Sequence, residues 1–149
     1  MWSNGSPARC KAFGQIIATF EEVSFQIAEV VMLLDAARPW LTRRPGRWIT
    51  GQNMNWIRRA VSEAKKFITE SCQKVVHNSM QVVGGIGYTN VFPLERIYRD
   101  IRLASIWTGT SEIMSIITAH EWYWEFLGKE IDTRPLDHEA FAEEEKIYE

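Results

Sequence analysis

The sequence predicts an all-α protein, an up-and-down bundle of three long helices and one short helix. Apolar residues recur at steps of three and four through most of the chain, which is the period of one helix face. Runs that alternate apolar and polar residues, as half-buried strands do, are absent from the sequence. Glycine and proline residues separate the helical stretches. A chain of 149 residues is also long enough to bury a core as one domain.

The first helix is predicted to begin at Thr19, whose side chain suits an N-cap. Residues 1–18 contain glycine and proline at irregular places and are expected to form an irregular segment. Pro39 is expected to kink or end the helix, unless tertiary packing carries it to Thr42. The apolar face of this helix is Phe20, Val23, Ile27, Val30, Val31, Leu34, Ala37 and Leu41.

A second, longer helix is predicted from about Asn53 to Val83, where two glycines stop it. Its predicted apolar face is Ile57, Val61, Ala64, Ile68, Cys72, Val75 and Ser79. A short third helix is expected to carry Pro93 in its first turn and to end near Leu103. Helices of about 25 and 30 residues are long for one small bundle, so packing against another domain or subunit is expected.

The fourth helix is predicted over residues 111–127 and closes a bundle that spans residues 19–127. It contains the aromatic run WYWEF at residues 122–126, which is expected to pack at a subunit contact. Residues 128–149 have a net charge of −5, whereas the whole chain has −2. This acidic tail is expected to be loose and solvated.

Composition and spacing exclude several classes of function. Lys and Arg number 17 and are scattered rather than gathered in a stripe, so nucleic-acid binding is not expected. No apolar run approaches the ~18 residues of a membrane span, and the N-terminus lacks the pattern of a secretory signal. The two cysteines and three histidines show no metal-ligand spacing, so no metal site is expected. A reducing, cytoplasmic setting fits this composition best.

Two stretches could either bind a ligand or only shape the chain. In MQVVGGIGYT, residues 80–89, the glycines let backbone amides approach a ligand, yet they also suit a helix end. The run follows a helix rather than a strand, so it is not a Rossmann fingerprint. In PLERIYRD, residues 93–100, the charges are spaced as the i,i+4 pairs Glu95–Arg99 and Arg96–Asp100. Such spacing is more typical of a self-paired surface than of a site.

The third stretch is IWTGTSEIM, residues 106–114. Thr108 or Thr110 can cap the fourth helix, and Glu112 complements the positive end of its dipole. A helix N-terminus is also a place where free amides can hold a phosphate. The turn therefore either starts a helix or binds an anionic group as well.

These stretches, in this order, resemble one family. QVVGGIGYTNVFPLERIYRDIRLASIWTGTSEIM resembles the C-terminal signature of the acyl-CoA dehydrogenases, and ARCKAFGQIIATFEEVSFQIAEVVMLLDAAR resembles the segment that enters their C-terminal helical domain. The resemblance covers about residues 9–127. It implies that the bundle is the C-terminal domain of such an enzyme, whose N-terminal helical and middle β domains have no counterpart in this chain.

The family oxidises acyl-CoA thioesters to 2-enoyl-CoA. A carboxylate removes the α-proton, the β-hydrogen leaves as hydride to the flavin, and an electron-transfer flavoprotein takes the electrons. The resemblance therefore implies FAD as cofactor, acyl-CoA as substrate of the complete enzyme and a place in fatty acid metabolism. It also implies a homo-oligomer, dimer or tetramer, formed through these helices, or a complementing subunit.

The FAD-contacting residues that the resemblance implies are Arg9, Phe13, Gln81, Val82, Val83, Gly84, Gly85, Thr110, Ser111 and Glu112. The segment 81–85 matches one that touches the FAD of the neighbouring subunit. The residues from Thr110 to Glu112 match a turn that contacts FAD at a helix start. Arg9 stands one step from the family's pyrophosphate arginine, whose place Cys10 takes.

Thr108 stands where many family members carry the catalytic glutamate, and a threonine hydroxyl cannot serve as that base. Glu112 lies one turn further on and matches a cofactor contact instead. Some branches take the base from a helix that precedes the matched segment. The resemblance thus implies no catalytic residue in this chain and no activity of the chain alone. An alternative is a non-catalytic oligomerisation or partner-binding module derived from the family.

Overall fold

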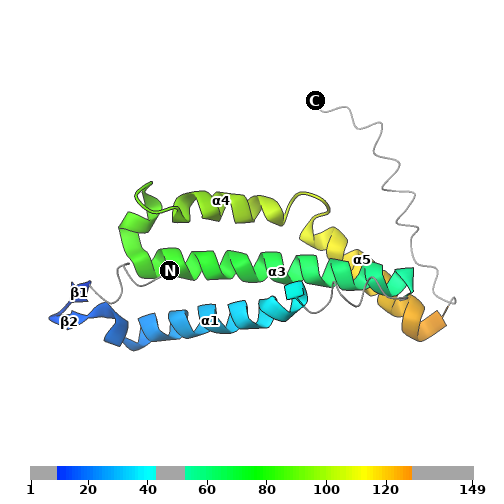
Figure 1. Cartoon of the computed structure of the whole chain (residues 1–149), viewed down its shortest axis with the longest axis horizontal. Helices are drawn as coiled ribbons and strands as arrows, with labels where there is room; N and C mark the ends of the chain where they lie inside the picture. The colour runs from blue at the N-terminus through cyan, green and yellow to red at the C-terminus, as the bar shows by residue number, and fades with distance from the viewer. Residues whose placement is uncertain (1–9, 43–52, 129–149) are drawn as a thin grey trace, which may run out of the picture.

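The computed structural model describes residues 10–42 and 53–128 of the chain. The described part is built almost wholly from helices, as Figure 1 shows, and this confirms the all-α prediction. In chain order the elements are β1 (Lys11–Ala12), β2 (Gln15–Ile16), η2 (Ile17–Thr19), α1 (Glu21–Thr42), α3 (Met54–Val83), η3 (Gly84–Tyr88), α4 (Leu94–Ala104) and α5 (Ser111–Leu127).

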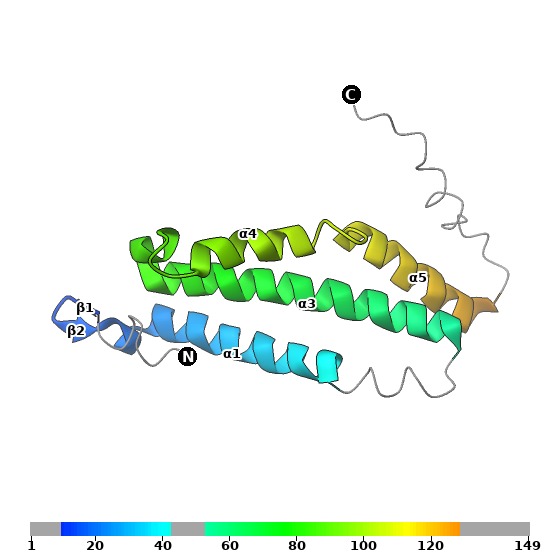
Figure 2. The same cartoon turned by 45° about the horizontal axis from the view of Figure 1, so that its top comes forward.

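Helix α3 is the centre of the bundle. Figures 1 and 2 show α1 along one side of α3, and α4 and α5 one after the other along the opposite side. All three run antiparallel to α3, so the predicted up-and-down arrangement is confirmed. Since α4 packs beside the C-terminal half of α3 and α5 crosses its N-terminal half, α3 is the helix with neighbours on two sides.

The N-terminal segment holds a small hairpin where irregular structure was expected. Strands β1 and β2 pair antiparallel. The two residues between them, Phe13 and Gly14, have φ angles of 52° and 79°, and a two-residue type I′ turn requires positive φ at both places. The expectation of irregular structure for residues 1–18 is therefore wrong for residues 11–16, which form a hairpin. Two-residue strands are too short to show an alternating pattern.

Thr19 is not the N-cap of α1, contrary to the prediction. It lies in η2, and its hydroxyl donates to the Ile16 carbonyl at 2.7 Å. The first helical hydrogen bond of α1 runs from the Ser24 N–H to the Phe20 carbonyl, at 3.1 Å. The threonine hydroxyl is satisfied locally by the short turn, and this competes with a capping role.

The predicted ends of α3 agree with the structure, whereas at Pro39 the alternative applies and α1 reaches Thr42. Helix α1 continues through Pro39, and beyond it Trp40 packs against Phe67 of α3 with ring centroids 5.9 Å apart. Tertiary packing thus outweighs the helix-breaking proline here. The Asn53 side chain caps α3 by accepting from the Asn55 N–H at 3.2 Å. Gly84, with φ of 73°, ends that helix.

The two remaining helices differ little from their predictions. Helix α4 begins directly after Pro93, which stands at its N-cap position rather than in its first turn, and ends at Ala104. Helix α5 spans residues 111–127 as predicted, with Thr110 as its cap. The cap accepts from the Ile113 N–H at 3.3 Å.

The apolar core is small and follows α3. Its members in the described residues are Val30, Ala37, Ala60, Ala64, Val76, Val82 and Met114. The predicted apolar face of α3 was only partly right, because Val61 is 43% exposed whereas Ser62 and Asn78 are buried. A helix that packs against neighbours on two sides buries positions around much of its circumference, so a single apolar stripe does not describe it.

Polar contacts fix both sides of α3. On one side the α1 residue Glu29 pairs with Lys74 and accepts from the Asn78 amide at 2.9 Å. On the other side Glu121 of α5, only 3% exposed, pairs with Arg58 at 3.4 Å. A buried carboxylate needs such a partner, because desolvation of an unpaired charge is costly. These pairs therefore help to set how α1 and α5 sit on α3.

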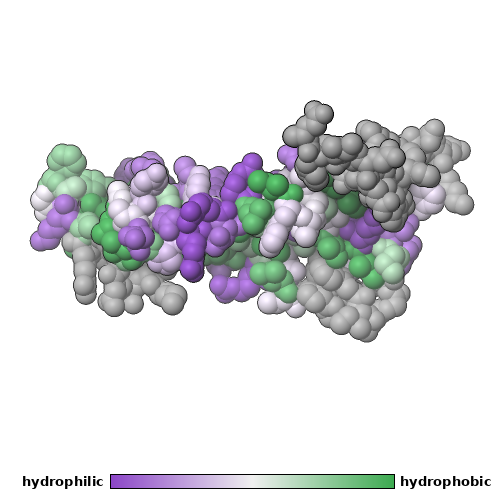
Figure 3. Space-filling model, turned by 90° about the horizontal axis from the view of Figure 1, so that it is seen from above, coloured by the Kyte–Doolittle hydropathy of each residue, from purple (hydrophilic) through white to green (hydrophobic). Residues whose placement is uncertain are grey.

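The surface has two characters. In Figure 3, hydrophilic residues gather along the middle of the visible face, where α4 lies. Apolar residues are exposed next to this hydrophilic area. The exposed large apolar side chains on α1 and α5 are Phe25, Ile27, Val31, Met32, Leu34, Leu41, Ile113, Ile116, Trp122, Tyr123, Trp124, Phe126 and Leu127. None of the described helices has the length and apolar character needed to cross a membrane.

Candidate functional site

The predicted site residues fall into two separate groups. Phe13 of the hairpin lies beside Gln81 and Val82 at the end of α3, and together they line a cavity of about 310 Å³. The turn with Thr110 and Ser111 lies at the other end of α4 and lines a different cavity of about 300 Å³. An 11-residue helix, about 16 Å long, separates the two groups. Arg9 lies outside the described residues.

The three glycines after α3 are glycine for different reasons. Gly84 needs its positive φ of 73° to end the helix. A Cβ on Gly87 would lie 3.2 Å from the Val83 Cγ1, so this position is constrained by packing. Gly85 has neither constraint, since a Cβ there would meet nothing within 4 Å. The absence of a side chain at Gly85 leaves its backbone open to close approach from outside the chain.

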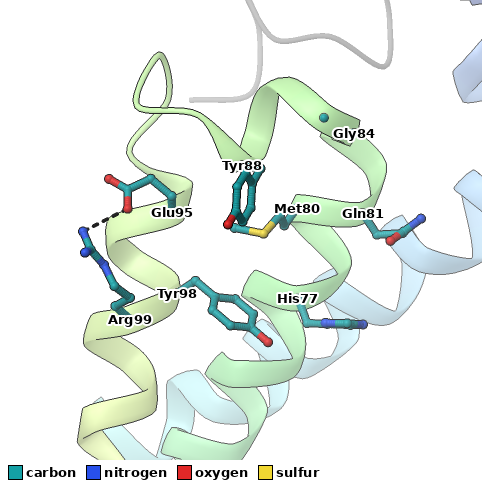
Figure 4. A pocket seen from close by; sticks show the side chains of 9 residues that line it. His77, Met80, Gln81, Gly84, Tyr88, Glu95, Tyr98 and Arg99 are labelled. Atoms are coloured by element: carbon teal, nitrogen blue, oxygen red, sulfur yellow. Dashed lines mark ion pairs between the residues drawn. The ribbon is translucent and has the colours of Figure 1, made fainter.

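A larger cavity of about 810 Å³ lies next to these glycines, between α3 and α4. Figure 4 shows Tyr88, Met80 and Tyr98 in the space between the two helices, with Glu95 and Arg99 on the outer side of α4. Gln81 projects from another side of α3. The sequence analysis did not single out the tyrosines, although each stands inside a stretch that it quoted. The sequence feature that could have indicated them is the tyrosine inside each of the two motifs, residues 80–89 and 93–100.

The charged face of α4 is partly self-paired, as expected. Glu95 and Arg99 form an ion pair at 2.9 Å, and Arg99 is 73% exposed. Arg96 and Asp100, also predicted to pair, form no ion pair with each other in the described structure, where both are exposed. At such exposure the missing pair costs little, because surface pairs contribute about 0.3–0.5 kcal/mol.

The turn before α5 has an unusual backbone. Thr108 has φ of 50°, and Gly109 has φ of 92°. A β-branched residue with positive φ is uncommon, and such conformations persist where the surroundings hold them. A Cβ on Gly109 would also lie 2.4 Å from the Met114 Cε. The Met114 Cε is the end of a flexible side chain that can move, so the backbone angle is the main reason for glycine at position 109.

Side chains around this turn form a polar cluster. Ser105 receives hydrogen bonds from Gln73 at 2.7 Å and from Arg102 at 2.6 Å. The backbone N–H of Ser111 donates to the Ser105 carbonyl at 3.2 Å. The Oγ of Ser111, by contrast, is buried and has no partner in the described structure. Because buried polar atoms are normally paired, this hydroxyl is open to a ligand.

Glu112 is held in its ionised form. The Thr110 hydroxyl, which hydrogen-bonds to the carboxylate, lowers the pKa of Glu112 below its ordinary value, and the residue's own backbone amide acts in the same direction. Lys66 and Arg102 lower this pKa by charge attraction, while partial desolvation opposes the shift. A carboxylate with a lowered pKa is a weaker base, so Glu112 suits hydrogen bonding better than proton removal.

Among the described residues, no carboxylate hydrogen-bonds to the Thr108 side chain. Its hydroxyl donates to the neighbouring Trp107 carbonyl at 2.8 Å, and both side chains are exposed. Cys10, at the place of the family arginine, is exposed as well. Within the described residues, no group of three or more His, Cys, Asp or Glu side chains is placed to hold a metal.

The described part of the chain is a helical bundle with two glycine-marked turns, and comparison with known proteins gives the family. Residues 8–122 match the model of the "Acyl-CoA dehydrogenase, C-terminal domain" family. The match covers more than half of the chain. The protein therefore belongs to the acyl-CoA dehydrogenase family of oxidoreductases, and its bundle is the family's C-terminal domain.

Individual relatives agree with this assignment. The chain is 33% identical to the short-chain specific acyl-CoA dehydrogenase of Bos taurus over 108 residues, which are 72% of this chain and 26% of that protein. It is 32% identical to the 3-(aryl)acrylate reductase of Clostridium sporogenes over 109 residues, 73% and 28% of the two chains.

A solved structure gives the same result. The acyl-CoA dehydrogenase of Geobacillus kaustophilus superposes with a TM-score of 0.71 and 32% identity, over 78% of this chain and 30% of that one. The chain thus spans less than a third of the length of each of these relatives.

Proposed function

We propose that this chain serves as the C-terminal domain of a flavin-dependent acyl-CoA dehydrogenase, which oxidises acyl-CoA to 2-enoyl-CoA. In this proposal the chain contributes FAD contacts and a subunit interface. The observation that carries it is a pair of helix ends with unused binding capacity: the open backbone at Gly85 and the buried, unpaired hydroxyl of Ser111.

The residues present fit FAD at both places. Gly85 leaves room for a ligand to reach the backbone. At the start of α5, the unpaired Ser111 hydroxyl adjoins a helix N-terminus, which favours phosphate oxygens. FAD, when bound, accepts the hydride from the substrate. The chain's own task is to bind and orient it, through Phe13 and residues 81–85 at one end and Thr110, Ser111 and Glu112 at the other.

The length of α4 favours contacts to two different flavins. A single domain that touches FAD at opposite ends of an 11-residue helix, about 16 Å long, can serve its own subunit at one end and a neighbour at the other. This supports an assembly in which a second subunit completes each site. The exposed apolar residues of α1 and α5 support the same assembly, since large apolar patches mark contact surfaces.

The catalytic base is proposed to lie outside this chain. The Thr108 hydroxyl is too weak a base, and Glu112 is held ionised as a hydrogen-bond acceptor. The chain alone is then inactive, and the complete enzyme passes its electrons to an electron-transfer flavoprotein. Turnover of acyl-CoA by the isolated chain with FAD and a dye acceptor would contradict this.

A second candidate is a non-catalytic helical module that keeps the bundle only for oligomerisation or partner binding. The threonine at position 108 and the cysteine at position 10 favour it. The open backbone at Gly85 and the unpaired Ser111 hydroxyl weigh against it, because a scaffold has no use for them. Binding of FAD separates the two candidates.

The test is Gly85→Leu, compared with Gly87→Ala. A Cβ at position 85 meets no atom of this chain within 4 Å, so the leucine should change the stability of the domain little. It should weaken FAD binding by the assembled enzyme at least about tenfold, because the side chain occupies the approach to the backbone. Alanine at position 87 crowds Val83, so it should lower stability and leave FAD affinity nearly unchanged. Equal FAD affinity in wild type and Gly85→Leu would contradict the proposed contact.

A further inference from the structure

A lysine of the central helix reaches the turn before α5. The Lys65 ammonium, on α3, donates a hydrogen bond to the backbone carbonyl of Gly109, 44 residues further along the chain. The other side-chain hydrogen bonds of residues 107–110 are local: from the Thr108 hydroxyl to the Trp107 carbonyl, from the Ile113 N–H to Thr110, and from the Thr110 hydroxyl to Glu112. Among the described residues, Lys65 is thus the side chain from another helix that holds this turn by a hydrogen bond.

This bond fixes the direction of a peptide group. The peptide between Gly109 and Thr110 is trans, so its carbonyl and its N–H point in opposite directions. The carbonyl points to Lys65 on α3, and the Thr110 N–H must therefore point away from α3. That N–H has no hydrogen-bond partner in the described structure. It is a donor presented on the outer side of the turn.

The peptide group needs such a restraint. Glycine tolerates positive and negative φ almost equally, so the plane beside Gly109 can flip at low cost. Gly109 has φ of 92°, and the neighbouring Thr108 is already in a strained region at 50°. A hydrogen bond from a charged donor is roughly twice as strong as a neutral one. The Lys65 bond is therefore strong enough to select one orientation of the plane.

We infer that Lys65 is a positioning residue. It locks the Gly109–Thr110 peptide so that the Thr110 N–H points away from α3 and stays free to donate to the flavin that residues 110–112 are proposed to contact. This inference rests on the proposed FAD contact of residues 110–112. It assigns a role to a lysine that lies on another helix and outside every motif of the sequence.

The next residue of the chain offers a matched control. Lys66 forms a surface pair with Glu70 at 3.0 Å, one turn along the same helix. Both lysines carry the same charge and the same stem, but only the Lys65 bond reaches the turn. Lys65→Met removes the bond and keeps the apolar stem, Lys65→Arg restores a cationic donor, and Lys66→Met removes a lysine that does not touch the peptide.

The first readout needs no flavin. Amide hydrogen exchange of the full chain reports whether the turn is held, through the Ser111 N–H, which is bonded to Ser105, and the Ile113 N–H, which is bonded to Thr110. In Lys65→Met both amides should exchange about tenfold faster, while the amides of α3 keep their protection. Lys66→Met should exchange like wild type. Circular dichroism confirms that each variant is folded.

The second readout is the FAD dissociation constant of the assembled enzyme. Lys65→Met should raise it about tenfold, Lys65→Arg should recover most of the loss, and Lys66→Met, which removes only a charge that acts on Glu112 without holding the turn, should raise it about twofold at most. Unchanged exchange in Lys65→Met overturns the inference, and so does faster exchange with unchanged FAD affinity. If the wild-type assembly itself binds no FAD, the proposed function fails, a result distinct from failure of the Lys65 variant alone.

Discussion

Helices α4 and α5 lie on the same side of α3 and run in the same direction, yet they have opposite surfaces. The outward side of α4 carries Glu95, Arg99 and other charged residues. Helix α5 exposes aromatic side chains, among them Trp124 at 42% and Phe126 at 60%. A helix that is apolar on its outer side as well as its inner side is normally covered. The comparison supports the proposal that α5, more than α4, provides the contact surface of an assembly.

The two helices also differ in how their charges are placed. The α4 pair Glu95–Arg99 is local and exposed, whereas the α5 residue Glu121 is buried and reaches Arg58 on α3. A surface pair contributes little, but a buried charge that loses its partner is costly. The buried ion pair of α5 thus positions that helix on α3. The exposed pair of α4 lies within the helix and contributes little to its position.

The largest expected effect is on the buried pair. Arg58→Met leaves Glu121 buried without its cation and should lower the free energy of unfolding by about 3 kcal/mol. The matched change on α4, Arg99→Met, should cost only about 0.3–0.5 kcal/mol. Urea unfolding of the full chain measures both. Equal losses in the two variants would contradict the contrast between the helices.

The next effect concerns association. Trp124→Glu and Phe126→Glu place charges on the exposed side of α5 and should weaken self-association or docking of the domain by about a hundredfold. Leu103 on α4 has a similar exposure of 47%, and Leu103→Glu should change the dissociation constant severalfold at most. Analytical ultracentrifugation over a range of concentrations measures the dissociation constants. If the α4 variant lost as much association as the α5 variants, the proposed difference between the two helix surfaces would be contradicted.

The smallest effect is a pH dependence at the α1–α3 contact. Hydrogen bonds from Lys74 and then Asn78 lower the pKa of Glu29 from 4.5. The unfolded chain therefore binds the proton more readily, and the stabilisation is present above pH 4.5 and is lost as the pH falls through the lower folded value. Glu29→Gln should make unfolding less sensitive to pH in that range. An acid profile identical to that of wild type would contradict the contact.

Sequence and structure agree best where local chemistry decides the backbone. Asn53 and Gly84 mark the ends of α3, and Thr110 marks the start of α5, because capping depends on neighbouring residues only. The hairpin around Phe13 was missed because its strands are two residues long. The buried side of α3 was partly missed because residues such as Ser62 and Asn78 are buried by neighbours on two sides.

The candidate site was predictable only in part. The motifs marked the glycines and the turn, since each motif is continuous in sequence. Their separation by the length of α4 needed the fold, because spacing along the chain does not give distance in space. The Lys65 contact was equally hidden, since it joins residues 44 positions apart. That Thr108 stands at the position of the family's catalytic glutamate stays a prediction from the resemblance. The structure adds that this residue has a positive φ angle.

One measurement tests the central claim most directly: the FAD content of the protein purified in its native assembly, compared with its content after Gly85→Leu. If the two helix ends are halves of flavin sites, the wild-type assembly should contain equimolar FAD, released on denaturation and quantified by fluorescence. The variant should be folded and largely depleted of it. A folded wild-type assembly that contains no FAD and takes up none would contradict the account and favour a helical module without a cofactor.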